Sequence, residues 1–298
     1  MHKMNLQRTL QRSIVRYYGP ICTTKQELIG RVGLGKQTRP SIVCSIAHKH
    51  NEHTRVCAAA METLHTAFLI ADDVCDNAKE RNGQLAWHSI HGANNAWNDA
   101  NFLVSTSTRM INDCFAGSLS SVVTSELSDT IATACIGQRT DMNVNLESVR
   151  YSEILDVYEQ MCFEKTGNYT FGLPIKLGLL LSDRDPTVVR EHIQAVSLHL
   201  GCIYQSCNDI RSTTNEDLLQ RRLTWMAAVV VRNHPSIQTL LLDPKVLLQQ
   251  YDQNDLASMH KVYCKKKTNL VMRHLDQMSE MGFQEAADVI EPFTREWI

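Results

Sequence analysis

The sequence lacks long apolar runs and an excess of charge of either sign. A run of about eighteen apolar residues, the length typical of a membrane-spanning helix, does not occur, so we expect no membrane span. The chain of 298 residues carries 30 basic and 32 acidic side chains, so neither nucleic acid nor an anionic membrane is an expected partner. The basic N-terminal stretch has no apolar segment, so we expect no secretory signal.

Paired cysteines, internal repeats, low-complexity segments and long linkers are also absent. The ten scattered cysteines form no CxxC pair, which fits reduced thiols in the cytoplasm better than disulfides or a zinc site. Alternating, strand-like runs are scarce, whereas apolar residues recur at helical spacing. We therefore expect one all-α domain over residues 1–298, a bundle of roughly ten or more helices. Gly167 and Pro174 predict a break in the helix that starts near Ser152.

The end of one long apolar stretch carries a cluster of aspartates. Asp72 and Asp76 are four residues apart in LHTAFLIADDVCD, so on a helix they share a face, with Asp73 beside them. Crowded carboxylates need a cation. Mg²⁺ is the natural candidate, because it uses few carboxylates and leaves room for waters and phosphates. Such a motif on its own is more often a solvated acidic turn.

A second polar cluster makes the metal hypothesis stronger. Asn208, Ser212 and Glu216 recur every four residues, so a helix would place them on one face, and Gln205 joins that face. An amide, a hydroxyl and a carboxylate are hard oxygen ligands that suit another Mg²⁺. The alternative is an ordinary polar helix end. Two metal-binding faces predict a polyanionic ligand, and diphosphate suits the Lys and Arg side chains found at loops and helix ends.

These stretches resemble the trans-isoprenyl diphosphate synthases and class I terpene synthases over nearly the whole chain. GKQTRP, at 35–40, is similar to the GKxxRP loop that binds isopentenyl diphosphate in that superfamily. GQRTD, FEKTG and DLLQRRLT, which start at positions 137, 163 and 217, resemble three further family motifs. The resemblance implies the isoprenoid synthase fold around a central prenyl diphosphate cavity, a prenyl diphosphate substrate and a homodimer.

The resemblance also implies roles for individual residues. The expected metal ligands, for three Mg²⁺ ions or Mn²⁺ in their place, are Asp72, Asp76, Asn208, Ser212 and Glu216. The expected catalytic set adds Asp73 and Lys165. The residues expected to bind diphosphate are Lys36, Arg39, His65, Arg81, Lys165, Thr166, Gln205 and Arg222. The apolar pocket for the prenyl chain is expected to include Phe68, Leu69, Gly201 and Tyr204, and Phe68, one turn below Asp72, favours ten or fifteen carbons over twenty.

Two departures from the family pattern divide the functional hypotheses. YQSCNDIRS, at 204–212, has Asn208 where chain-elongating enzymes have aspartate, and with Ser212 and Glu216 it matches the NDxxSxxxE motif of terpene cyclases. Asn82 replaces the second of two family arginines. On this motif we expect a terpene synthase that ionises geranyl, farnesyl or geranylgeranyl diphosphate to a terpene hydrocarbon or alcohol and diphosphate. The retained loop and His65 favour the alternative, a short-chain prenyltransferase.

Two further alternatives follow from the same resemblance. One is an irregular enzyme that couples two dimethylallyl units, because asparagine also occurs in its second motif. The other is a non-catalytic partner subunit, which the complete first motif disfavours. The sequence does not decide among substrate lengths or products.

Overall fold

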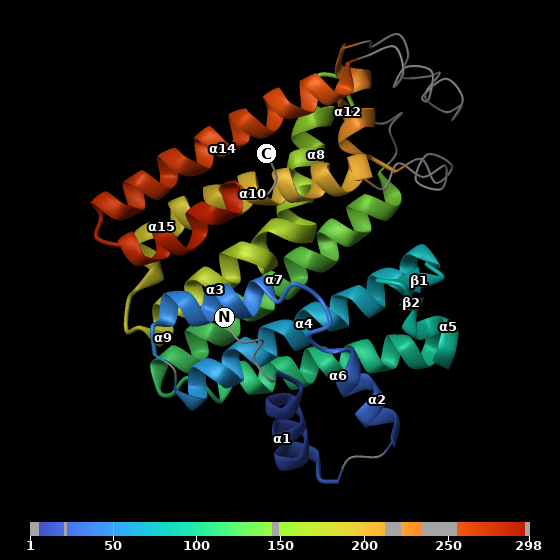
Figure 1. Cartoon of the computed structure of the whole chain (residues 1–298), viewed down its shortest axis with the longest axis vertical. Coiled ribbons are helices and arrows are strands. Elements are labelled where there is room, and N and C mark those ends of the chain that lie inside the picture. The colour runs from blue at the N-terminus through green and yellow to red at the C-terminus, as the bar shows by residue number, and fades with distance from the viewer. Residues whose placement is uncertain are drawn as a thin grey trace. The chain divides into compact units, whose positions relative to one another are not determined.

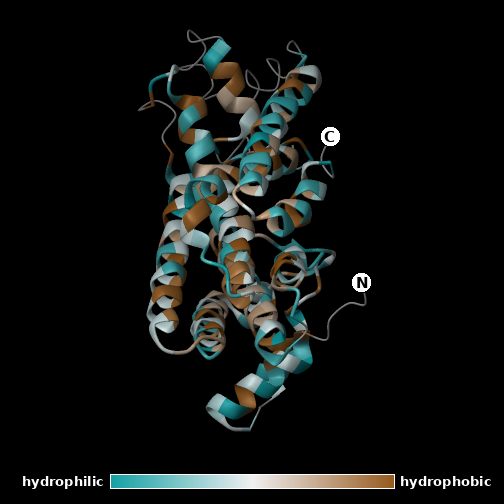
Figure 2. Cartoon of the chain, turned by 90° about the vertical axis from the view of Figure 1, so that its left-hand side faces the viewer, coloured by the Kyte–Doolittle hydropathy of each residue, from teal (hydrophilic) through white to brown (hydrophobic). Residues whose placement is uncertain are grey.

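The computed structural model describes residues 6–20, 23–49, 51–144, 149–211, 222–233 and 255–295. The regular secondary structure within these ranges is helical except for one short hairpin, which confirms the predicted all-α class (Figure 1). Teal and brown residues share the same helices in Figure 2, as expected of amphipathic elements. Within the same ranges, none of the helices has the length and apolar character needed to cross a bilayer.

The chain clusters into two compact units. Unit 1 comprises Met1–Asp129 and Pro174–Pro186, and unit 2 comprises Thr130–Leu173 and Thr187–Ile298. Two helices, α7 (Ser118–Asn143) and α9 (Leu173–Leu181), contribute residues to both. The organisation as a single domain therefore stays a prediction.

Unit 1 is built around α4 (Glu52–Asp76), which packs against α1 (Leu6–Tyr18), α3 (Thr38–Ala47) and α6 (Ala93–Asn112). The consecutive residues 57–64 of α4 are all buried, as expected of a helix surrounded by others. The side chain of Asn51 caps its start by accepting a hydrogen bond from the Thr54 N–H at 2.9 Å. Unit 1 also contains α2 (Thr23–Arg31), β1 (Glu80–Arg81), β2 (Gln84–Leu85) and α5 (Trp87–His91).

Unit 2 is built around α10 (Arg190–Arg211). It packs against α8 (Ile154–Cys162), the π-helix Phe163–Gly172, α12 (Trp225–Asn233) and α14 (Leu256–Glu280). The short 3₁₀ turn Pro186–Val189 leads into α10, and α15 (Gln284–Ile290) and the 3₁₀ turn Glu291–Thr294 follow α14.

The predicted break between Gly167 and Pro174 is wrong, because the chain stays helical from α8 through the π-helix into α9. The backbone N–H of Leu173 bonds to the carbonyl of Asn168, five residues back. This wider turn accommodates the missing N–H of Pro174 where the π-helix changes to α-helix.

Glycines allow the π-helix to lie directly against its neighbours. A Cβ at Gly167 would fall 2.3 Å from the carbonyl oxygen of Ser197, and one at Gly201 would fall 2.8 Å from the Cα of Gly167. A Cβ at Gly137 of α7 would lie 2.2 Å from the backbone nitrogen of Lys165. These are backbone contacts, so the neighbours cannot rotate away.

We expect Gly167→Ala to lower the free energy of unfolding by about 1–3 kcal/mol, because overpacking shifts backbone. The matched control is Gly30→Ala, since nothing lies within 4 Å of a Cβ at that helical position. The control should be neutral or stabilise slightly. Urea denaturation of both variants measures the difference, and equal midpoints would contradict the close packing.

Candidate active site in two units

The aspartate cluster lies at the C-terminal end of α4, in unit 1. The helix ends at Asn77, whose φ of 51° is left-handed and whose N–H bonds to the carbonyls of Asp73 and Val74. Asp72 and Asp76 are partly buried, whereas the side chain of Asp73 is only 4% exposed. The three neighbouring carboxylates therefore differ in their access to a ligand.

A short hairpin brings Arg81 back onto this cluster. Arg81 pairs with Gln84 across strands β1 and β2, and the intervening Asn82 and Gly83 both have positive φ, 53° and 74°. These angles are those of a two-residue hairpin turn, for which Asn-Gly is strongly preferred. The Asn82–Gly83 dipeptide was a signal for this hairpin, which our sequence analysis missed.

Arg81 bridges two of the aspartates. Its Nε donates to Asp73 Oδ1 at 2.8 Å, and its Nη2 donates to Asp73 Oδ1 and, at 2.9 Å, to Asp72 Oδ2. Burial raises the pKa of Asp73, although the hydrogen bond from Arg81 lowers it. Asp73 therefore holds Arg81 in place, and Asp72 shares that guanidinium.

The cluster fits a divalent cation. Carboxylates at the C-terminal end of a helix face the negative end of its dipole, and Arg81 neutralises only part of their charge. Asp72 and Asp76, the two on one face, are the residues that would hold Mg²⁺ or Mn²⁺. Asp73, which was predicted among the catalytic residues, instead accepts hydrogen bonds from Arg81.

A small cavity of about 90 Å³ lies beside this cluster within unit 1. Of the predicted residues, His65, Leu69, Asp73 and Arg81 line it. Burial, with the nearby charges of Arg39 and Arg81, holds the pKa of His65 well below its usual range, so this imidazole is neutral at pH 7. The cavity therefore combines an apolar wall, a neutral imidazole and a guanidinium.

Sequence reasoning missed several residues of the cavity wall, among them Arg31, Glu62 and Trp87. Arg31 of α2 bonds to the carbonyl of Leu85 at 3.1 Å and lies over the Trp87 ring, 5.3 Å from its centroid. Glu62 is buried, and its Oε2 has no hydrogen-bond partner among the described residues. Burial raises the pKa of Glu62, and the charge of Arg39 opposes this. No local pattern in the sequence marks these long-range neighbours.

The predicted loop 35–40 divides into an exposed and a buried cation. Lys36 is exposed, whereas Arg39, in the first turn of α3, is only 5% exposed. Phe68 is half-buried on α4 and does not line the cavity described above. Its role in limiting chain length stays a prediction.

In unit 2, two predicted cations converge on one carboxylate. Lys165 Nζ lies 2.7 Å and Arg222 Nη1 lies 3.3 Å from Asp141 Oδ2, and Asp141 is 7% exposed. Asp141 thus holds a lysine and an arginine side chain close together. Such a group suits diphosphate, with Arg as a fork and Lys as a point charge.

The predicted residues Thr166 and Gln205 belong to a buried network around Asp209. Thr166 Oγ1 donates to Gln205 Oε1 at 3.4 Å, and Gln205 Nε2 donates to Asp209 Oδ1 at 3.0 Å. The Tyr158 hydroxyl and the Trp225 N–H donate to Asp209 Oδ2 at 2.7 and 2.8 Å. Burial raises the pKa of Asp209 to about 6. Asp209 thus ties α10 to α8 and α12.

The structure places only some of the remaining residues that were predicted on and after α10, and it tests none of their roles. Asn208 is partly buried near the end of the helix, whereas Ser212 and Glu216 lie outside the described residues. Gly201 packs against Gly167, and Tyr204 is partly buried. The metal set Asn208–Ser212–Glu216 and the pocket roles of Gly201 and Tyr204 stay predictions.

Comparison with known proteins places this geometry in a family. Residues 29–263 match the family described as polyprenyl synthetase. Farnesyl pyrophosphate synthase of Schizosaccharomyces pombe is 25% identical over 279 residues, covering 88% of this chain and 77% of the relative. The human farnesyl pyrophosphate synthase is 22% identical over 222 residues, covering 68% of this chain and 50% of the relative.

A solved structure is similar over nearly the whole chain. The farnesyl diphosphate synthase of T. brucei, complexed with a bisphosphonate, has a TM-score of 0.82 at 18% identity and covers 98% of this chain and 95% of that one. This likeness bears on the fold, and it confirms the predicted isoprenoid synthase architecture. With more than half of its length matched, the chain belongs to the polyprenyl synthetase family.

Proposed function

We propose that this protein is a short-chain trans-prenyltransferase, which joins isopentenyl diphosphate to an allylic prenyl diphosphate. The observation that carries the proposal is the cavity lined by Asp73, with Arg31, Arg81 and His65 on its wall. A second, non-allylic diphosphate substrate needs a site of its own with guanidinium groups such as these. The match to the polyprenyl synthetase family and the relatives named farnesyl pyrophosphate synthase support the same choice.

The proposed reaction needs no protein nucleophile. The allylic C–O bond breaks, diphosphate leaves, the isopentenyl double bond forms the new C–C bond, and a proton is lost from the product. Mg²⁺ held by Asp72 and Asp76 would supply Lewis-acid stabilisation of the leaving diphosphate. Lys165 and Arg222 of unit 2 would supply positive charge toward a diphosphate.

The isopentenyl site combines residues predicted from the sequence with others found in the structure. Lys36 and Arg39, which do not line the cavity, would add cations from the loop, and His65 would provide a neutral hydrogen-bonding group. Arg31 provides a second guanidinium where Asn82 replaces the family arginine. Phe68 favours products of fifteen carbons or fewer, and a homodimer is proposed from the family resemblance alone.

A terpene synthase is the second candidate, and Asn208 is the observation that favours it. Asn208 stands where chain-elongating relatives of the superfamily have aspartate, and with Ser212 and Glu216 it forms the cyclase pattern. In that case the substrate's own double bonds or water would quench the cation. We rank this candidate second because a terpene synthase has no second diphosphate substrate to bind in the cavity lined by Arg31 and Arg81.

One incubation separates the candidates. Purified protein is given Mg²⁺ and dimethylallyl or geranyl diphosphate, with and without isopentenyl diphosphate. A longer prenyl diphosphate formed only with isopentenyl diphosphate supports the proposal. Volatile hydrocarbons or alcohols formed without it would replace the proposal with terpene synthesis, and no product in either arm would point to a non-catalytic subunit.

We expect Arg31→Gln to raise the KM for isopentenyl diphosphate by about tenfold or more, because a charge-assisted hydrogen bond is worth roughly 1.5–3 kcal/mol. The KM for the allylic substrate should change little. Lys25→Gln is the matched control, since Lys25 also lies on α2 over an aromatic ring, that of Phe102, but is not part of the cavity wall. Equal KM values for the two variants would remove Arg31 from the proposed site.

A further inference from the structure

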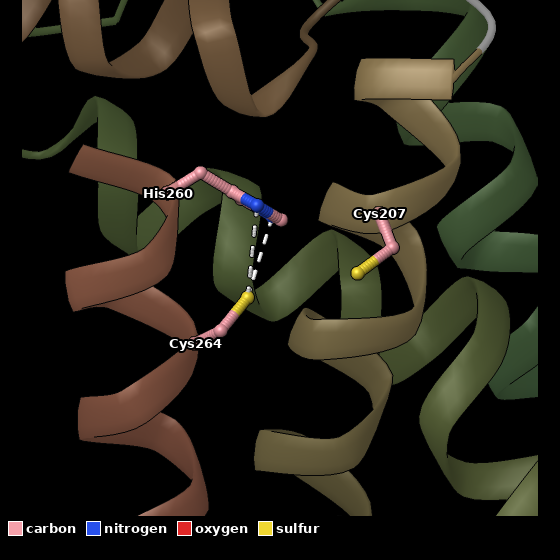
Figure 3. Close-up of side chains that lie close together, drawn as sticks. All are labelled: Cys207, His260 and Cys264. Carbon is pink, nitrogen blue, oxygen red and sulfur yellow. Dashed lines mark hydrogen bonds between the residues drawn. The ribbon is translucent and has the colours of Figure 1, made fainter. Parts of the chain in front are cut away.

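A cluster of two thiols and one imidazole lies between α10 and α14 in unit 2. Cys207 comes from α10, and His260 and Cys264 come from α14, one helical turn apart. Figure 3 shows the three side chains directed toward one another across the space between the two helices. Their ligand atoms all lie within 4.8 Å of one another. The mechanism proposed above uses none of these three groups.

The spacing of these atoms is close to that of a tetrahedral metal site. Zinc–sulfur bonds of about 2.3 Å and zinc–nitrogen bonds of about 2.0 Å place tetrahedral ligands roughly 3.5–3.8 Å apart. Cys264 Sγ lies 3.3 Å from Nε2 of His260. The other separations are at most 4.8 Å, so the set has to close by about 1 Å or less to reach this spacing.

The surroundings suit a neutral, soft-metal centre. Cys207 and Cys264 are 6% and 2% exposed. Two thiolates and one neutral imidazole balance the charge of a divalent ion, and this balance is what a buried site demands. Thiolate ligands select zinc over magnesium, which prefers oxygen. The site is therefore chemically distinct from the aspartate cluster of unit 1.

Neighbouring groups fix the imidazole. The His260 ring lies edge-on to Trp225 with centroids 4.9 Å apart, and Nε2 lies 3.0 Å from the Ser206 hydroxyl. Ser206 donates in turn to the Ile203 carbonyl at 3.1 Å. When Nε2 binds the metal, the Ser206 hydroxyl gives up its contact with Nε2 and lies beside the open coordination position, while the Trp225 contact still restrains the ring. A water beside Ser206 would complete the fourth position.

We propose that Cys207, His260 and Cys264 form a zinc site that joins α10 to α14. This inference goes beyond the proposed prenyl transfer and does not depend on it. The sequence analysis disfavoured zinc because the cysteines form no CxxC pair. The ligands instead come from two helices, Cys207 and His260 are 53 positions apart, and only the His260–Cys264 spacing is local. Binding releases the two thiol protons and fastens the helix that carries Asn208.

Cobalt substitution tests the site without any enzymatic assay. The reduced, chelator-treated full chain is titrated with Co²⁺, and we expect ligand-field bands of a tetrahedral ion with thiolate-to-cobalt charge transfer. Zn²⁺ should abolish these bands at one equivalent, and excess Mg²⁺ should not. X-ray absorption at the zinc edge should give two sulfur neighbours and one nitrogen.

Variants assign the ligands. Cys207→Ser and His260→Asn should each weaken Zn²⁺ binding by at least about 100-fold, more than the loss of an outer contact costs. Cys202→Ser is the control, because Cys202 is a buried thiol of the same helix that donates to the Glu159 carbonyl and belongs to no metal-ligand cluster among the described residues. Circular dichroism shows whether each variant folds. If a variant misfolds, the X-ray absorption spectrum of the wild-type protein decides the ligand set instead.

Three results would overturn the proposal. The first is a cobalt spectrum without charge transfer, and the second is equal Zn²⁺ affinity in Cys207→Ser and Cys202→Ser. The third is a disulfide between Cys207 and Cys264, detected by mass spectrometry in protein isolated with thiols blocked.

Discussion

Replacing Asp72 by Asn is expected to lower kcat by about 10²–10³-fold while the fold is retained. Removal of one group that stabilises charge in the transition state typically costs that much. Asp72 is partly exposed and shares the Arg81 guanidinium with Asp73, so its loss leaves Arg81 bound. The free energy of unfolding should change by less than about 1 kcal/mol, because exposed ion pairs contribute little.

Three matched variants make this result specific. Asp76→Asn should behave like Asp72→Asn, and both should need more Mg²⁺ for half-maximal activity. Asp73→Asn should mainly reduce stability, because Asp73 is buried and accepts both Arg81 donors. Asp129→Asn, at an exposed position of α7, should change neither quantity. A full rate for Asp72→Asn at ordinary Mg²⁺ concentration would exclude Asp72 as a metal ligand.

Asp209→Ala is expected to lower the free energy of unfolding by about 3 kcal/mol or more. It leaves the Trp225 N–H and the Tyr158 hydroxyl buried without their acceptor, and each orphaned group costs roughly 1–3 kcal/mol. Asp209→Asn keeps the shape and one acceptor oxygen, so its loss should be smaller. Urea denaturation measures all three proteins, and an unchanged midpoint for Asp209→Ala would show that the network does not hold α10.

The Asp209 carboxyl also makes the stability of the fold depend on pH, and it favours the folded state at lower pH. The pKa of Asp209 is raised from 3.8 to about 6 in the folded chain, so folded protein holds its proton more tightly than unfolded protein does. The contribution of protonated Asp209 to the free energy of unfolding is fully present below about pH 4. It is lost as the pH rises through 6, which lowers the free energy of unfolding by about 3 kcal/mol. The stability difference between wild type and Asp209→Asn should therefore shift in favour of the variant over that range.

Local patterns predicted much of unit 1. Helical periodicity and the DDxxD spacing placed the aspartates on one long helix, and the structure confirms that helix as α4. Arg81 reaches the aspartates because of a hairpin, and the Asn82–Gly83 dipeptide was its signal in the sequence. Arg31 and Glu62 were missed because their place on the cavity wall follows from helix packing, which no short window of sequence encodes.

Unit 2 shows the limit of the same reasoning. Lys165 and Arg222 were selected as cations, but their shared partner Asp141 lies 24 and 81 residues away along the chain. The π-helix was read as a break, because Gly and Pro mark interruptions and wide turns alike. The Cys207 cluster likewise joins residues from distant segments.

The hairpin has a consequence for how this part of the protein assembles. The Arg81 contacts span only eight and nine residues, so closing that loop costs little chain entropy. The acidic helix end and its guanidinium are therefore among the contacts that form fastest, since low sequence separation speeds folding. The contacts of Arg81 with Asp72 and Asp73 are therefore expected to form before contacts between helices that are far apart in the sequence.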